Sequence, residues 1–151
     1  MRRSTFVVVS ISAVLVATTA IAAADGRRLA TTLSGAEEMP SGVGDPDGSG
    51  TAELTLNAGH EEVCYELTWQ NLDGSVQRAH IHEAPAGHNG GITVSLFEGQ
   101  SFAGTGSASG CDLGDATRDE ILRILQDPSG FYVNIHDSAR PAGAIRGQLS
   151  R

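Results

Sequence analysis

Short runs in which apolar and polar residues alternate recur along the chain after residue 25, and glycine, proline, asparagine and aspartate separate them. Alternation with a period of two residues is typical of a half-buried β-strand, and the separating residues are those that turns require. Their length and spacing predict an all-β fold, an antiparallel β-sandwich or barrel. The expected strands are Leu29–Leu33, Thr51–Leu56, Val63–Trp69, Val76–His82, Ile92–Phe97, Phe131–His136 and Ala144–Leu149.

Two segments depart from this pattern. Thr117-Arg118-Asp119-Glu120 has the form of a capping box, and four apolar residues follow it at helical spacing before Asp127-Pro128. We therefore expect one short helix that covers an end of the sandwich. Residues 103–110 are small and polar, and they fit an edge strand and a flexible loop equally well.

The first 24 residues have the order of a secretory signal peptide. Arg2 and Arg3 precede an uncharged run, Val7–Ala24, which ends in three alanines. We expect this segment to be removed, residues 25–151 to form one domain, and the mature protein to be secreted or otherwise extracytoplasmic. A retained membrane anchor is the alternative, because the run is near the length that spans a bilayer, although serines and threonines dilute its hydrophobicity.

Acidic residues dominate the mature chain. Once Arg2 and Arg3 are removed, 8 of the 10 basic residues remain against 18 acidic ones, so the formal net charge is −10. Nucleic acid and anionic membrane surfaces are poor partners for such a chain. We expect no nucleic-acid partner and no membrane span after removal of the signal, and the charge does not identify an extracytoplasmic partner.

The two cysteines, Cys64 and Cys111, both lie in the part expected to be exported. An even count in an oxidising compartment favours one disulfide, which would close a loop of 47 residues between positions 64 and 111. Thiolates that bind a metal are the weaker alternative, because the chain has no Cys-x-x-Cys spacing.

Two tetrapeptides share a pattern that brings histidines together. Side chains in an extended strand alternate between faces, so the histidines of Ala79-His80-Ile81-His82 lie opposite its apolar pair. Val133-Asn134-Ile135-His136 repeats the pattern and adds a third histidine. If the two strands are neighbours, roughly 5 Å apart, three imidazoles converge on one surface patch.

Three converging imidazoles have the ligand type and spacing that copper and zinc accept, at roughly 2 Å from each nitrogen. His88, in the glycine-rich segment 87–91, is within reach as a fourth ligand. We therefore predict a metal site of His80, His82, His136 and His88, with copper or zinc as the metal. The alternative is that these histidines only form hydrogen bonds with neighbouring loops.

Arg146 belongs to another expected strand. Ile145 and Leu149 form the apolar side of that strand, so Arg146 points away from the core and onto the expected histidine face. A guanidinium there could guide an anion towards a metal. Alternatively, Arg146 pairs with Glu83 or Asp137 and only locks the sheet.

Two other kinds of site are not expected. The segment Asp45–Gly50 copies the first half of a calcium-binding loop, but position twelve is Leu56 instead of glutamate. A turn that leads into a strand explains the same residues, so we do not expect calcium. No serine lies in a Gly-x-Ser-x-Gly motif, and we assign no catalytic residue.

Six separated blocks of the chain resemble, in order, the CHRD domain, a family that is named after chordin and is common in exported bacterial proteins. The resemblance covers nearly the whole mature chain and implies an immunoglobulin-like β-sandwich or barrel of Greek-key type. It implies little about activity, so we expect a binding or structural module. The blocks are Leu33–Pro40, Gly50–Ala52, Cys64–Leu67, Ala79–His82, Tyr132–His136 and Pro141–Leu149.

A second resemblance, to Cu,Zn superoxide dismutases, concerns the order of the His-x-His-Glu segment, the glycine-rich histidine loop, the late histidine strand and the arginine. It implies that His80, His82 and His136 hold copper, that His88 is a bridging ligand, and that Arg146 guides the anion. The zinc-binding subloop is missing, and the arginine stands at a different spacing from its glycine. The alternative to a non-enzymatic binding module is therefore a copper-only superoxide dismutase.

Overall fold

The computed structural model describes residues 26–112 and 114–150. The expected signal peptide, residues 1–24, lies outside the described residues. The seven strands expected from the alternation are all present, and an eighth, β6, is added. The elements are β1 (Arg27–Ser34), β2 (Ser49–Asn57), β3 (Glu62–Gln70), β4 (Val76–Glu83), β5 (Gly91–Phe97), β6 (Gly106–Cys111), α1 (Arg118–Gln126), β7 (Phe131–Asp137), β8 (Ile145–Gln148), and two 3-10 turns, Gly35–Glu37 and Pro128–Gly130.

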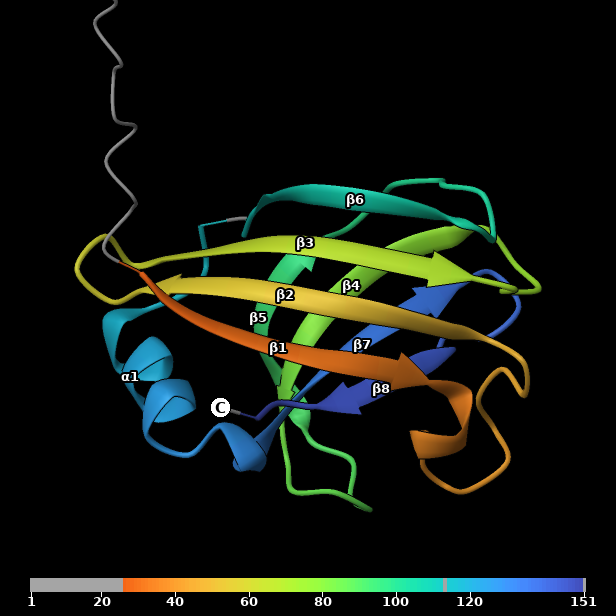
Figure 1. Cartoon of the computed structure of the whole chain (residues 1–151), viewed down its shortest axis with the longest axis horizontal. Helices are drawn as coiled ribbons and strands as arrows, with labels where there is room; N and C mark the ends of the chain where they lie inside the picture. The colour runs from red at the N-terminus through yellow and green to blue at the C-terminus, as the bar shows by residue number, and fades with distance from the viewer. Residues whose placement is uncertain (1–25, 113, 151) are drawn as a thin grey trace, which may run out of the picture.

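The strands form one antiparallel sheet that folds over into two layers (Figure 1). The order along the sheet is β5-β4-β7-β8-β1-β2-β3-β6. One layer holds β1, β2, β3 and β6, and the strands of the other layer cross behind it. Within the strands, β1 and β8 are joined at the single pair Ser34 and Arg146, so the sheet turns from one layer into the other at this point. The predicted antiparallel sandwich or barrel is confirmed.

The hydrophobic core lies between the layers and follows the predicted alternation. Each fully buried leucine or isoleucine stabilises the fold by about 1.5–3 kcal/mol. The strand residues that form this core are Leu29, Leu33, Ala52, Leu54, Leu56, Val63, Tyr65, Leu67, Trp69, Val76, Ala79, Ile81, Val94, Leu96, Phe97, Phe131, Val133, Ile135 and Ile145.

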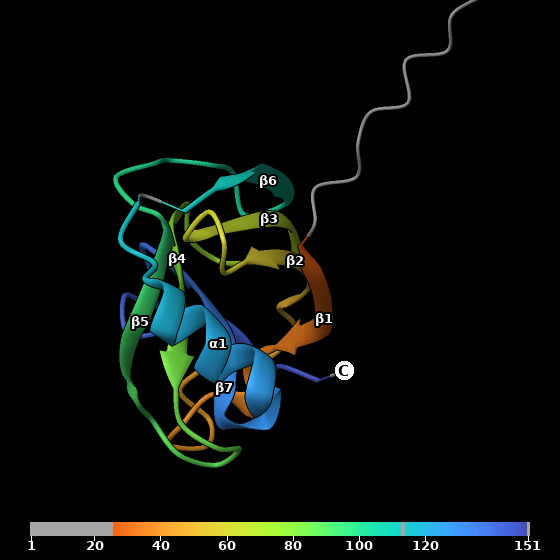
Figure 2. The same cartoon turned by 90° about the vertical axis from the view of Figure 1, so that its left-hand side faces the viewer.

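The predicted helix α1 covers one end of the two layers (Figure 2). Its capping box is complete: the Thr117 hydroxyl accepts from the Glu120 backbone N–H at 3.3 Å, and the Glu120 carboxylate accepts from the Thr117 N–H at 2.9 Å. Ile121 and Ile124 of the helix are fully buried against the core. Over the described ranges, no helix has the length and apolar character needed to cross a membrane.

Residues 103–110, which the sequence left open, include most of an edge strand. This strand, β6, pairs with β3 in a register that places Cys111 opposite Cys64, and the two cysteines form the predicted disulfide. A small residue is needed at position 110 because the Tyr65 ring of β3 lies beside it. A Cβ atom on Gly110 would come within 3.0 Å of the Tyr65 hydroxyl.

Candidate metal centre

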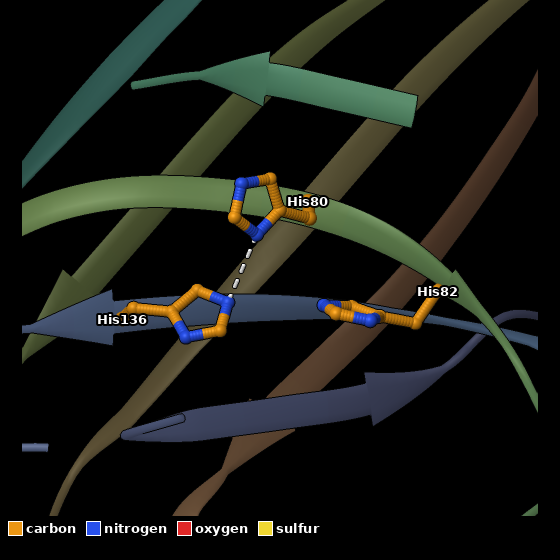
Figure 3. A group of neighbouring side chains, drawn as sticks. All are labelled: His80, His82 and His136. Atoms are coloured by element: carbon orange, nitrogen blue, oxygen red, sulfur yellow. Dashed lines mark hydrogen bonds between the residues drawn. The ribbon is translucent and has the colours of Figure 1, made fainter. Parts of the chain in front are cut away.

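The strands β4 and β7, which carry the histidines, are neighbours, as the sequence argument required. Ala79 and Ile81 of β4 face the core and are fully buried, and His80 and His82 lie on the opposite side of the strand. The antiparallel register places His80 opposite Asn134 and His82 opposite Tyr132. His136 lies two residues beyond Asn134 on the same face of β7, so all three imidazoles meet there (Figure 3).

The histidine cluster is buried, so the expectation of a surface patch is wrong. His80, His82 and His136 are only 2%, 8% and 5% exposed. The face on which they lie points away from the hydrophobic core, but chain segments outside the strands fold over it. Gly90 contacts His82 and Pro141 contacts His136. Strand alternation determines which face a side chain occupies, and it carries no information about loops that cover that face.

One nitrogen of each imidazole faces the other two rings. The Nδ1 atom of His80 lies 3.1 Å from the Nε2 atom of His136 (Figure 3). One ligand nitrogen from each of the three histidines lies within 4.8 Å of the others. The Nε2 atom of His82 is buried and has no hydrogen-bond partner among the described residues.

The second nitrogen of each imidazole is held by an acceptor. The Nδ1 atom of His82 lies 3.1 Å from the carbonyl oxygen of Gly90, and the Nδ1 atom of His136 lies 3.2 Å from that of Pro141. A carbonyl oxygen can only accept, so Nδ1 carries the proton in both rings and Nε2 keeps a lone pair. Metal-binding histidines are typically oriented by such outer hydrogen bonds.

His80 uses the opposite nitrogen. Its Nε2 atom donates to the Glu98 carboxylate at 2.8 Å, so its Nδ1 atom is directed at His136. Because the Nε2 atom of His136 carries a lone pair, two states fit the 3.1 Å contact. Either a second proton on His80 is shared between the rings, or both lone pairs bind one cation.

Burial keeps the other two imidazoles neutral. It lowers the pKa of His82 to about 4, against the opposing effect of the hydrogen bond to Gly90, and nearby His80 and Arg146 lower it further. Burial also lowers the pKa of His136 to about 3, and the neighbouring histidines add to the shift. Both rings are therefore in the form that binds metals at neutral pH.

Arg146 lies on the histidine face, as its strand position predicted. Its guanidinium carbon lies 3.5 Å from the centre of the Tyr132 ring, and this ring stacks on His82 with centroids 4.9 Å apart. Nη1 of Arg146 donates to the carbonyl oxygen of His88 at 3.0 Å and to Oδ1 of Asn89 at 3.2 Å.

The ion pairs considered for Arg146 do not form within the described part of the chain. Glu83 pairs with Arg123 instead. The Asp137 carboxylate accepts from the backbone N–H groups of Gly74 and Arg140. The charge of Arg146 instead acts on His82 and on the carboxyl group of Glu38.

His88 does not join the cluster. Its side chain is exposed on the loop between β4 and β5, and only its backbone carbonyl contacts the site, through Arg146. The ligand group found among the described residues on this face consists of His80, His82 and His136. The proposal of His88 as a fourth ligand therefore has no geometric support.

The site also contains two glutamates that were not predicted from the sequence. Glu98 directly follows β5 and holds His80. Glu38 follows the first 3-10 turn, is 2% exposed, and has one carboxylate oxygen 3.5 Å from Nδ2 of Asn134. Burial raises the pKa of Glu38 to about 7, although Arg146 and Asn134 oppose the shift. Neither glutamate lies in a sequence pattern that predicts its position in the site. Contacts between loops and strands bring both residues there.

Asp45, the first residue of the calcium-like segment, is fully buried and forms an ion pair with Arg140 at 2.6 Å. Its carboxylate also accepts from the Asp73 backbone N–H at 3.0 Å. Both contacts tie the turn to loops at this end of the sandwich, in agreement with a structural interpretation of the segment.

Fold and site together define an antiparallel two-layer β-sandwich with a buried histidine cluster on the outer side of one layer. The family model of the CHRD domain matches residues 29–149. The chain therefore belongs to the CHRD-domain family. Comparisons with curated proteins and with solved structures give no significant match.

Proposed function

We propose that this protein is an exported CHRD-domain binding module whose three buried histidines bind one copper ion. One observation carries the proposal: three imidazoles turn one nitrogen towards a common point while an acceptor holds the other nitrogen of each ring. Histidines that served only to satisfy loops would not need to converge in this way. The outer acceptors are those expected around a metal centre.

The separation of the ligand nitrogens of His80 and His136 agrees with a shared ion. Metal–nitrogen bonds of about 2.0–2.1 Å in tetrahedral geometry place two ligand nitrogens about 3.3 Å apart. The corresponding separation between His80 and His136 is 3.1 Å. Only a small adjustment of the rings is therefore needed to place both lone pairs on one ion.

Copper is the preferred metal because the donor set consists of three imidazole nitrogens. Sites of nitrogen ligands generally bind Cu(II) more tightly than Zn(II). The disulfide between Cys64 and Cys111 and the signal-like segment before residue 25 support an extracytoplasmic location for the site.

A copper-only superoxide dismutase is the second candidate, and the position of Arg146 favours it. The guanidinium lies on the histidine face and stacks on the ring that stacks on His82, so it would attract an anion to this side of the sheet. The burial of all three histidines favours the binding module, because a turnover site must admit its substrate.

Titration of metal-free protein with copper in the presence of a competing chelator tests the proposal. The wild type should bind one equivalent, and His80→Ala, His82→Ala and His136→Ala should each weaken binding. His60→Ala and His88→Ala are matched controls, because both side chains are exposed, and they should bind as the wild type does. Wild-type affinity in all three cluster variants would refute the site. Superoxide turnover by loaded wild-type protein, lost in Arg146→Gln, would favour the enzyme over the binding module.

A further inference from the structure

Two oxygen atoms on the histidine face are buried without hydrogen-bond partners among the described residues, beside the orphaned Nε2 atom of His82 and the Nε atom of Arg78, the residue opposite His136. They are Oδ1 of Asn134 and Oε1 of Glu38, and both residues are more than nine-tenths buried. A buried acceptor that lacks a partner destabilises the fold, and more so when it is charged. Such groups are rare in folded proteins, so two next to one histidine cluster require an explanation.

The strand register places Asn134 against the candidate metal centre. It is directly opposite His80 and lies two residues from His136 on the same face of β7. Residues opposite each other in an antiparallel pair have Cβ atoms about 4.5–5.5 Å apart. Glu38 extends this polar group, because its Oε2 atom contacts Nδ2 of Asn134.

The backbone beside these two side chains leaves no room for another one. A Cβ atom on Gly143 would lie 2.6 Å from Oε2 of Glu38 and 2.8 Å from Nδ2 of Asn134, and the φ angle of Gly143 is +149°. Only glycine fits this position without strain. The carboxyl and the amide are thus enclosed by the chain with their remaining acceptor atoms unused.

The chemistry of the unused atoms indicates what fits beside them. The amide oxygen of Asn134 and an ionised Glu38 carboxylate only accept hydrogen bonds, so a ligand beside them must donate at least to the amide oxygen. A buried water typically binds to such otherwise unsatisfied polar groups. The lone pair on His82 is accounted for separately by the proposed copper ion.

We propose that Glu38 and Asn134 form a subsite for one water-sized ligand that donates hydrogen bonds, and that this ligand completes the coordination of the copper ion. The second part, that the ligand completes the coordination of copper, rests on the proposed function. The first part, that Glu38 and Asn134 hold a ligand, does not. A metal centre with three protein ligands and one small exchangeable ligand is an open site, in contrast to a closed structural one. The subsite therefore determines whether copper here can react.

The first experiment uses metal-free protein and water as the probe. In an isotope-labelled sample, the side-chain amide protons of Asn134 should show a nuclear Overhauser effect to a long-lived water molecule. Glu38→Leu, which replaces the carboxyl with an apolar group of similar size, should abolish it, and Glu37→Leu at the exposed neighbouring position should not. Absence of the effect in the wild type would overturn the subsite, whether or not copper binds.

The second experiment measures how Cu(II)-loaded protein relaxes bulk water protons. The wild type should show the enhancement expected for one exchanging water on the metal. Glu38→Leu and Asn134→Ala should lose it while still binding copper, and Glu38→Gln, which keeps an acceptor oxygen, should retain it. If both Glu38→Leu and Asn134→Ala kept the full enhancement, or if the wild type showed no enhancement, the second part would be overturned. Failure of the wild type to bind copper refutes the proposed function and, with it, this second part only.

Discussion

The Nε2 atom of His80 donates a hydrogen bond to Glu98 at 2.8 Å, and this contact determines which nitrogen of His80 faces the other histidines. The Glu98 carboxylate is half exposed, whereas His80 is 2% exposed. A residue at the surface thus orients a ligand in the interior.

Replacing Glu98 should therefore weaken metal binding without unfolding the protein. Loss of an outer-sphere partner typically costs about 10–100-fold in metal affinity. We expect this loss of copper affinity in Glu98→Ala, measured by chelator competition. Glu83→Ala is the control, because Glu83 is similarly exposed, belongs to the histidine strand β4, and pairs with Arg123 away from the imidazoles. Equal affinity in the two variants would show that Glu98 does not position His80.

The two faces of β4 should differ sharply in their effect on stability. Ile81 is fully buried in the core, and truncation to alanine should lower the free energy of unfolding by about 2–5 kcal/mol. His82→Ala should cost much less in metal-free protein, because it also removes a buried nitrogen that has no partner among the described residues. Urea denaturation of both variants measures the difference. A larger loss for His82→Ala than for Ile81→Ala would contradict the assignment of the faces.

The disulfide should contribute strongly to stability, because it closes a loop of 47 residues. Removal of a disulfide from a small exported domain typically costs about 2–5 kcal/mol. We expect a loss of this size in the double variant Cys64→Ser, Cys111→Ser, measured by thermal and urea unfolding beside the oxidised wild type. The reduced wild type should unfold like the double variant, and a large difference between these two would point to effects of the serines themselves.

Glu38 should make stability depend on pH in an unusual direction. Its pKa is raised from 4.5 to about 7 in the folded protein, so the folded state binds the proton more tightly than the unfolded chain does. The stabilisation from Glu38 is complete below about pH 4.5 and is lost as the pH rises through about 7. The wild type should therefore lose roughly 3 kcal/mol relative to Glu38→Gln across this window, at about 1.4 kcal/mol per pKa unit.

The buried histidines act in the opposite direction on total stability. The lowered pKa values of His82 and His136 mean that stability is lost as the pH falls from about 6.5 towards 4 and 3. Because both histidines are present in the wild type and in Glu38→Gln, their contribution cancels in the difference between the two proteins. A difference that does not vary with pH would show that Glu38 is not perturbed by burial.

Local patterns were enough to predict seven of the eight described strands and the faces of their residues. Alternation placed His80 and His82 opposite Ile81, and it placed Arg146 on the face of the histidines, because the period of a strand is fixed by its backbone geometry. The capping box at Thr117 likewise predicted the start of α1, since its hydrogen bonds join residues only three positions apart.

Contacts between distant segments could not be predicted in this way. Glu38 and Glu98 reach the site from loops, and nothing in their local sequence distinguishes them from exposed glutamates such as Glu37. The position of His88 depends on its loop as well: proximity in the sequence placed it near the cluster, whereas in the structure its carbonyl group contacts Arg146 and its side chain is exposed. Burial of the cluster depends on these loops as well.

The way in which the two layers are joined determines how stabilisation by a bound ligand spreads through the protein. All three histidines belong to β4 and β7, in the layer that meets the other layer along β1 and β8 at the Ser34–Arg146 pair. The free energy of a bound ion would therefore first suppress local opening of β4 and β7, and slow amide exchange in these strands. Protection from amide exchange in β2 and β3, which belong to the other layer, would rise only to the extent that the shared core makes both layers unfold as one cooperative unit.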